Sequence, residues 1–220
     1  MTARISYERE LTTLHENLIE MGNLIETAIR NTFAAFEDKN YALAEEIIRD
    51  DRNINDMERV IESRCLSLIL RQQPVAGDLR VVSTALKVVT DMERIGDHAS
   101  DIAELILRIN GEHDFHSVTH LPEMAEAAVA MVHEAIQAFV NQDVDAAEQI
   151  IKEDDKVDEL FNKVKNEVID LLKQTGDISD QSIDFLMIAK YVERIGDHAV
   201  NICEWTQFSK TGKLKNVRIL

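Results

Sequence analysis

One internal repeat dominates this sequence and limits its fold most strongly. The seven residues ERIGDHA occupy positions 93–99 and return at 193–199, an offset of 100. The segment 36–57 also aligns with 139–160, at an offset of 103. A repeat of this length within 220 residues predicts two copies of one structural unit, the second copy being three residues shorter between the two blocks.

Each copy shows the spacing of three amphipathic helices. In the first copy, one apolar series runs from position 11 to 36, a second ends before Pro74, and a third spans about 78 to 109. Intervals of three and four place these side chains on one face of a helix, and proline does not continue a helix. The first and third series comprise Leu11, Leu14, Leu18, Met21, Ile25, Ala28, Thr32, Phe36, Leu79, Val82, Leu86, Val89, Met92 and Ile106.

The fold class follows from these series and from the composition. The chain contains 7 glycines and 2 prolines, and 5% of its residues are aromatic, which is little for sheets and their turns. We therefore predict an all-α protein of two tandem three-helix bundles, with six long helices related by internal duplication. The predicted boundaries are 1–110 for the first bundle, 121–209 for the second, and 210–220 for a basic C-terminal tail.

Charge and hydropathy narrow the range of partners. A net charge of -17 repels phosphate backbones and anionic lipid, so we expect no nucleic-acid partner. The sequence has no stretch of 18 apolar residues and no apolar segment of the signal-peptide type, and its 2 cysteines lack metal-ligand spacing. We expect a cytoplasmic protein with free thiols. The tail is either a solvated end or a contact for an acidic partner.

The repeated heptapeptide places carboxylates on one helix face, because residues four apart lie one turn apart on the same side. Like charges at this spacing repel each other, so a pair that occurs twice suggests a bound cation. A glycine inside a helix costs about 1 kcal/mol relative to alanine. Gly96 and Gly196 therefore indicate close helix approach or room for an ion. The residues on this face are Glu93, Asp97, Asp101, Glu193, Asp197 and Asn201.

A second acidic set is expected to face the first from the preceding helix of each half. Its members, again four residues apart, are Asp51 and Asn55 in the first half and Asp154 and Asp158 in the second. At 1.5 Å per residue, both sets lie about 30 Å from the hairpin turn that joins their helices. Oxygen ligands from two facing helices suit Mg²⁺, Mn²⁺ or Fe³⁺, and suit Zn²⁺ less well.

Other interpretations of these residues stay open. Acidic stripes on a protein of this charge are also typical of solvated outer surfaces. His98 and His198 point about 100° away from the carboxylate face, so they are candidates for packing or partner contacts before metal ligation. One interpretation is excluded: ferritin-like carboxylate enzymes use Glu-x-x-His motifs on facing helices, and neither copy has this motif, since Glu93 and His98 are five residues apart.

The two ERIGDHA copies, the acidic pairs before them and the segment RQQPVAGDLRVVSTALKVVTDMERIGDHASDI at 71–102 closely resemble the PhoU family of bacterial phosphate-transport and phosphate-signalling regulators. The resemblance covers essentially the whole chain. It implies two tandem three-helix bundles, often dimeric, that carry metal ions or multinuclear iron clusters on a carboxylate surface. Iron, manganese or magnesium is the expected metal, with zinc as a further option. The implied ligands are Glu93, Asp97, Glu193 and Asp197, followed by Asp51, Asp154 and Asp158.

One position departs from the family pattern. Asn55 stands where aspartate is usual, and an amide supplies only a neutral oxygen. The first-half site is therefore expected to bind more weakly or to hold fewer ions than the second.

The resemblance also implies a non-enzymatic function, that of a negative regulator of the phosphate-starvation (Pho) regulon. Such a protein couples the high-affinity phosphate ABC transporter, through its ATPase subunit, to a sensor histidine kinase, and modulates phosphate uptake. Its association with the inner membrane is indirect. Two alternatives arise from the residues: a carboxylate-bridged metalloenzyme, either hydrolase or oxidase, with ion-bound water as nucleophile, and ions that only stabilise the bundle.

Overall fold

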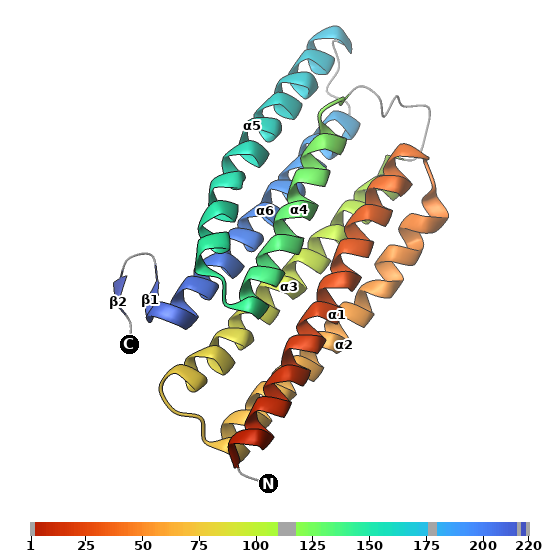
Figure 1. Ribbon diagram of the computed structural model, residues 1–220. Coiled ribbons are helices and arrows are strands. Elements are labelled where there is room, and N and C mark those ends of the chain that lie inside the picture. The colour runs from red at the N-terminus through yellow and green to blue at the C-terminus, as the bar shows by residue number, and fades with distance from the viewer. Residues whose placement is uncertain (1–2, 110–117, 176–179, 215–216, 219–220) are drawn as a thin grey trace.

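The computed structural model describes residues 3–109, 118–175, 180–214 and 217–218. Six long helices account for most of this part of the chain, which confirms the predicted all-α fold (Figure 1). None of the described helices has an apolar stretch long enough to cross a membrane. The helices are α1 (Ala3–Glu37), α2 (Tyr41–Gln72), α3 (Gly77–Arg108), α4 (Leu121–Asn141), α5 (Val144–Thr175) and α6 (Asp180–Thr211).

The third helices of the two halves, α3 and α6, pack against each other in the middle of the molecule (Figure 1). On one side α1 and α2 complete a bundle with α3, and on the other α4 and α5 complete a bundle with α6. Because α1 also packs against α4, the buried side chains of both halves form one continuous core. The C-terminal ends of α2 and α5 lie at opposite ends of the molecule.

The predicted apolar series lie in this core with one exception. Thr32, the polar member of the α1 series, is buried, and its hydroxyl donates to the carbonyl of Ala28 at 2.8 Å. Leu79 was predicted to face the core, but its side chain is 40% exposed. It lies in the first turn of α3, at the end of the bundle, where Leu70 and Val75 are exposed as well. Among the fully buried α1 side chains are those of Leu14, Leu18, Met21 and Ile25.

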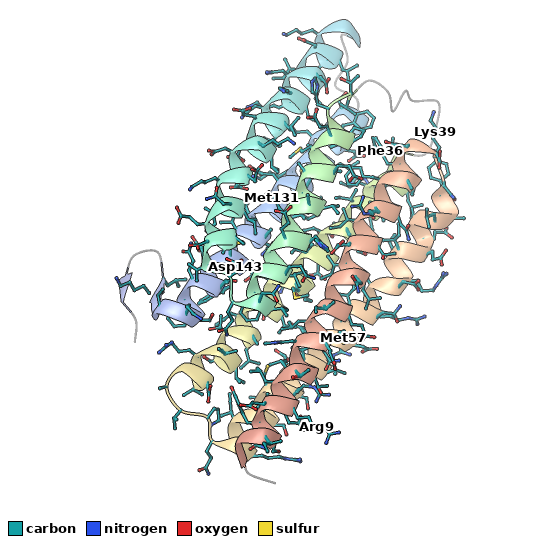
Figure 2. The ribbon with its side chains drawn as sticks, in the orientation of Figure 1. Arg9, Phe36, Lys39, Met57, Met131 and Asp143 are labelled. Atoms are coloured by element: carbon teal, nitrogen blue, oxygen red, sulfur yellow. The ribbon has the colours of Figure 1, made fainter. Side chains whose placement is uncertain are left out.

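The duplication extends to the turns that begin α2 and α5. Lys39 and Gln142, 103 residues apart, have φ angles of 52° and 53°. The next residue caps the following helix in both halves, because Asn40 and Asp143 accept hydrogen bonds from the backbone N–H three residues on, at 3.1 and 2.9 Å. Figure 2 shows Lys39 at the upper right of the view and Asp143 lower down on the left. The helices that lead to these two turns, α1 and α4, run in opposite directions (Figure 1).

The cysteines carry no reactive chemistry. Cys65 and Cys203 are free and buried in the core. Burial raises the pKa of both thiols to about 12. Because the thiolate is the nucleophile, neither side chain reacts readily at neutral pH.

The C-terminal tail contains a short antiparallel strand pair that the sequence did not predict. Strands β1 (Lys213–Leu214) and β2 (Val217–Arg218) pair so that Lys213 lies opposite Arg218. Gly212, with a φ of 71°, separates β1 from the end of α6. Strand β1, which contains the basic residue Lys213, packs beside α6.

Candidate metal-binding carboxylates

The predicted acidic residues of the first half come together between α2 and α3. We define the first cluster as Asp51, Asn55 and Glu58 of α2 with Glu93 and Asp97 of α3. Burial, followed by the negative charge of Asp97, raises the pKa of Asp51. The same two causes raise the pKa of Glu93. The two helices therefore present their carboxylates to each other, as predicted.

A glycine permits this close approach. A Cβ atom at Gly96 would lie 2.9 Å from Ile54 Cδ1 and 3.6 Å from Asp51 Oδ1. The first distance is shorter than side-chain packing allows, so a larger residue at this position would displace α2 or Ile54. Gly96 thus brings the Asp51 side chain against the backbone of the ERIGDHA turn.

Two oxygens of the first cluster lack a hydrogen-bond donor. The amide of Asn55 donates to Asp51 Oδ2 at 2.9 Å. Asp51 Oδ1 and Asn55 Oδ1 are buried, and no group in the described part of the chain donates to either. A buried acceptor without a donor is costly, and a cation is one species that would satisfy both oxygens.

An internal cation already lies at the edge of the first cluster. The Arg94 guanidinium donates to Asp97 Oδ2 at 2.8 Å, and its Nε lies 3.4 Å from Glu93 Oε2. The arginine side chain is 55% exposed, whereas those of Glu93 and Asp97 are 17% and 29% exposed. Arg94 can therefore swing into solvent without disturbing the core.

The second half builds an equivalent site between α5 and α6. We define the second cluster as Asp154 and Asp158 of α5 with Glu193 and Asp197 of α6. Burial and then the charges of Asp158 and Asp197 raise the pKa of Asp154 to about 6. A Cβ atom at Gly196 would lie 3.3 Å from Asp154 Oδ1. The duplicated glycine therefore plays the same part in both halves.

The cationic neighbour differs between the two clusters. In the second half Lys190 forms a short ion pair with Glu193. Arg194, the counterpart of Arg94, lies over the ring of Tyr191, with its guanidinium carbon 5.8 Å from the ring centre. Among the residues that the structure describes, Asp197 thus has no arginine partner like that of Asp97.

The last two predicted ligands, Asp101 and Asn201, have their nearest polar partners outside the two clusters. The amide of Asn201 donates to Asp91 Oδ1 across the α3–α6 interface, at 3.1 Å. Asp101 Oδ2 lies 3.5 Å from His98 Nδ1, and the Asp101 charge is the weakest of the causes that raise the pKa of Asp51. One turn beyond Asp97, this helix face has turned toward the other half.

A polar network at this interface escaped the sequence analysis. Asp91 accepts hydrogen bonds from Asn201, from Trp205 Nε1 at 3.2 Å, and pairs with His198 Nδ1 at 2.8 Å. The ring of His198 lies 5.5 Å from that of His98, centre to centre. Both histidines therefore serve in packing between the halves, one of the two roles expected for them. The sequence did contain a sign of this network. The offset of 100 aligns Asp91 with a tyrosine, so this position differs between the two copies of the repeat.

Glu58 is the other residue that the sequence analysis missed. Burial raises its pKa, and Asp97 is among the charges that raise it further. It follows Asp51 by seven residues, which is two helical turns on the same face. Its counterpart in the second half is Phe161, so the repeat comparison alone did not mark it.

The donor set fits a hard cation in its chemistry. All of the side-chain atoms that would coordinate the metal are oxygens. In the first cluster two of these oxygens are buried and accept no hydrogen bond from the described residues. Within the described ranges, however, no three histidine, cysteine or carboxylate groups already converge on one point. An ion would therefore bind by drawing side chains together rather than by entering a finished cage.

Comparison with known proteins gives a match over both halves. The family model described as PhoU domain matches residues 18–106 and 121–206. A phosphate-specific transport system accessory protein PhoU homolog from Clostridium acetobutylicum is 40% identical over 214 residues, which are 97% of this chain and 97% of that protein. The phosphate-specific transport system accessory protein PhoU of Escherichia coli K12 is 28% identical over 94% of this chain and 86% of its own length.

Two solved structures share the fold. The phosphate transport system regulatory protein PhoU from Streptococcus pneumoniae superposes with a TM-score of 0.85 at 28% identity, over 94% of this chain and 98% of that one. PhoU from Pseudomonas aeruginosa gives a TM-score of 0.86 at 30% identity, over 94% and 100% of the two chains. The similarity therefore extends to the packing of both bundles.

Proposed function

Because this chain belongs to the PhoU family, we propose that it is an accessory and regulatory protein of a phosphate transport system. One observation carries the proposal: a phosphate-specific transport system accessory protein matches it at 40% identity over 97% of both chains. The shared fold with a phosphate transport system regulatory protein supports it.

In this role the protein represses the Pho regulon when phosphate is plentiful. It docks on the ATPase subunit of the phosphate transporter and on the cytoplasmic part of a sensor histidine kinase, so that the state of the transporter reaches the kinase. The protein works in the cytoplasm and reaches the inner membrane through these partners. It acts as a homodimer. Long helix faces with a net charge of -17 support docking through helix surfaces and complementary charge.

Metal binding by the two clusters is the second part of the proposal. Glu93, Asp97 and Asp51 would hold a hard cation in the first half, and the corresponding ligands in the second half are Glu193, Asp197, Asp154 and Asp158. Iron, manganese or magnesium would neutralise carboxylates that otherwise repel one another and would fix each pair of helices. The raised pKa values of Asp51, Glu93 and Asp154 support such a site, because a cation would relieve the repulsion that contributes to them.

The metalloenzyme alternative has less support. A hydrolase or oxidase of this type needs preorganised ligands around its ion, and no three such groups converge in the described residues. The buried thiols, with pKa values of about 12, are not nucleophiles at neutral pH.

Deletion of the gene, with a phosphate-starvation reporter, tests the proposed function. We expect strong reporter expression in phosphate-rich medium after deletion, and repression again when the wild-type chain is supplied. The double variant Asp97→Ala/Asp197→Ala, checked for folding, then separates regulation from structure. Restored repression by that variant would limit the metal to a stabilising role, and unchanged reporter expression in the deletion strain would contradict the regulatory function itself.

A further inference from the structure

Arg94 engages both acidic residues of the first ERIGDHA copy. Its guanidinium donates to Asp97 Oδ2 at 2.8 Å, and its Nε lies 3.4 Å from Glu93 Oε2. One arginine side chain thus holds the pair of carboxylates that the proposed metal site would use. Burial and then the charge of Asp97 raise the pKa of Glu93, and the positive charge of Arg94 acts against this rise. The first cluster therefore already contains part of the positive charge that a metal ion would bring.

The repeat shows a second placement of the same arginine. Arg194 occupies the equivalent position in the second half, at an offset of 100. Its guanidinium carbon lies 5.8 Å from the centre of the Tyr191 ring. The first half has Asp91 in place of this tyrosine, and that carboxylate accepts hydrogen bonds from three α6 side chains. At this repeat position the arginine thus has two placements, one on the carboxylates and one against a neighbouring ring.

The second cluster receives its positive charge from a different position of the repeat. Lys190 forms a short ion pair with Glu193, and its Nζ lies 5.5 Å from the centre of the Phe161 ring. Thr90 and Glu58 stand at the places of this lysine and this phenylalanine in the first half, which therefore has no equivalent pair. Among the described residues the lysine pairs with one carboxylate, whereas the arginine of the first cluster contacts two.

We propose that Arg94 is an internal counterion of the first cluster, which a hard cation must displace in order to bind there. This inference rests on the metal binding proposed above. The arginine side chain is more exposed than Glu93 or Asp97, so it can leave for solvent while the carboxylates stay between the helices. A guanidinium and a metal ion also repel each other. Metal binding to the first cluster is therefore weakened by the arginine, and it releases a guanidinium to the surface of α3.

Calorimetric titration of the full-length protein with Mn²⁺ tests this competition. Asp197→Ala, checked for folding by circular dichroism, leaves the first cluster as the intact site. Adding Arg94→Gln should then tighten Mn²⁺ binding about tenfold, because no ion pair has to be broken and a repelling charge is gone. In the matched comparison, adding Arg194→Gln to Asp97→Ala should change the Kd of the second cluster less than about twofold. Asn55 is the same in every variant, so its effect cancels.

The stability of the metal-free protein separates competition from a structural role. In EDTA, Arg94→Gln should lower the Tm, because Glu93 and Asp97 lose their counterion and repel each other one helical turn apart. The same substitution should nevertheless tighten Mn²⁺ binding. An arginine that only stabilised the helix pair would, on removal, lower the Tm and weaken Mn²⁺ binding together.

Arginine modification reports the displacement itself. We expect Mn²⁺ to speed the reaction of phenylglyoxal with Arg94 in the wild-type protein, as followed by mass spectrometry of peptides. Arg194 is the control in the same molecule, because it does not hold the carboxylates, and its rate should stay unchanged.

The possible failures can be told apart. Mn²⁺ binding that is unchanged or weaker after Arg94→Gln would overturn the counterion role while leaving the metal site in place. Equal tightening by Arg194→Gln would also overturn it, since any nearby positive charge would then have the same effect. If neither background binds Mn²⁺, the metal binding proposed above is wrong, and the counterion role fails with it.

Discussion

Alanine substitution should lower stability at Gly96 but not at the equivalent Gly196. At Gly96 the new Cβ would meet Ile54 Cδ1 at 2.9 Å and Cγ2 at 3.0 Å. Ile54 is 3% exposed, so it has little room to move away. At Gly196 the nearest atom is Asp154 Oδ1 at 3.3 Å, which needs to move by only a few tenths of an ångström.

The expected magnitudes follow from two opposing terms. Glycine to alanine inside a helix gains about 1 kcal/mol, and overpacking a buried site costs about 1–3 kcal/mol. We expect Gly96→Ala to lower the free energy of unfolding by about 1 kcal/mol, and Gly196→Ala to leave it unchanged or to raise it by up to about 1 kcal/mol. In a protein of this size 1 kcal/mol corresponds to roughly 2–4 °C in Tm.

A double-mutant cycle identifies the contact responsible. Ile54→Val removes Cδ1 and should cost about 1 kcal/mol in the wild-type background. In the Gly96→Ala background it relieves the 2.9 Å contact with Cδ1 and leaves the 3.0 Å contact with Cγ2, so its cost should be clearly smaller than in the wild-type background. Urea unfolding of the four proteins measures these differences. A Gly96→Ala protein that is more stable than wild type, or additive effects in the cycle, would refute the packing argument.

The same structure supports three further predictions. Asp91→Asn removes the negative charge of a carboxylate that accepts hydrogen bonds from three α6 side chains. It should lower the free energy of unfolding by about 2–3 kcal/mol, as measured by urea unfolding. Because the pKa of Asp154 is raised to about 6, the folded state binds its proton more tightly than the unfolded state, and the carboxylate destabilises the fold above that pH. Asp154→Asn should therefore raise Tm near neutral pH in EDTA, with the difference vanishing toward pH 4 or below; a constant difference would contradict this. Mn²⁺ should raise the Tm of the wild-type protein, because a ligand at a hundredfold excess over its Kd adds about 2.7 kcal/mol to the free energy of unfolding. The Tm of Asp97→Ala/Asp197→Ala should rise much less.

Local patterns in the sequence were sufficient to predict much of this fold. The three- and four-residue spacing of α1 and the end of α2 before Pro74 depend on near neighbours in the chain. The facing of Asp51 and the ERIGDHA helix also followed, because two antiparallel helices joined by a short turn align residues at equal distances from it.

Contacts between the two halves could not be predicted in this way. The helical repeat places Asp101 on the same face as Glu93 and Asp97, but it does not reveal where α6 crosses α3. Asn201 therefore hydrogen bonds to Asp91 instead of facing α5. Likewise, Leu79 has an apolar spacing and yet lies at a bundle end where its side chain is 40% exposed. Partners distant in sequence decide such positions.

The most direct test of the regulatory proposal is the binding of the purified protein to the ATPase subunit of the host's phosphate transporter, measured with bound metal assayed in parallel. We expect saturable binding of the wild-type protein, and loss of both metal and binding in Asp97→Ala/Asp197→Ala. No binding of metal-loaded wild-type protein to that subunit, at low or high phosphate, would contradict the central claim that this chain acts on a phosphate transport system.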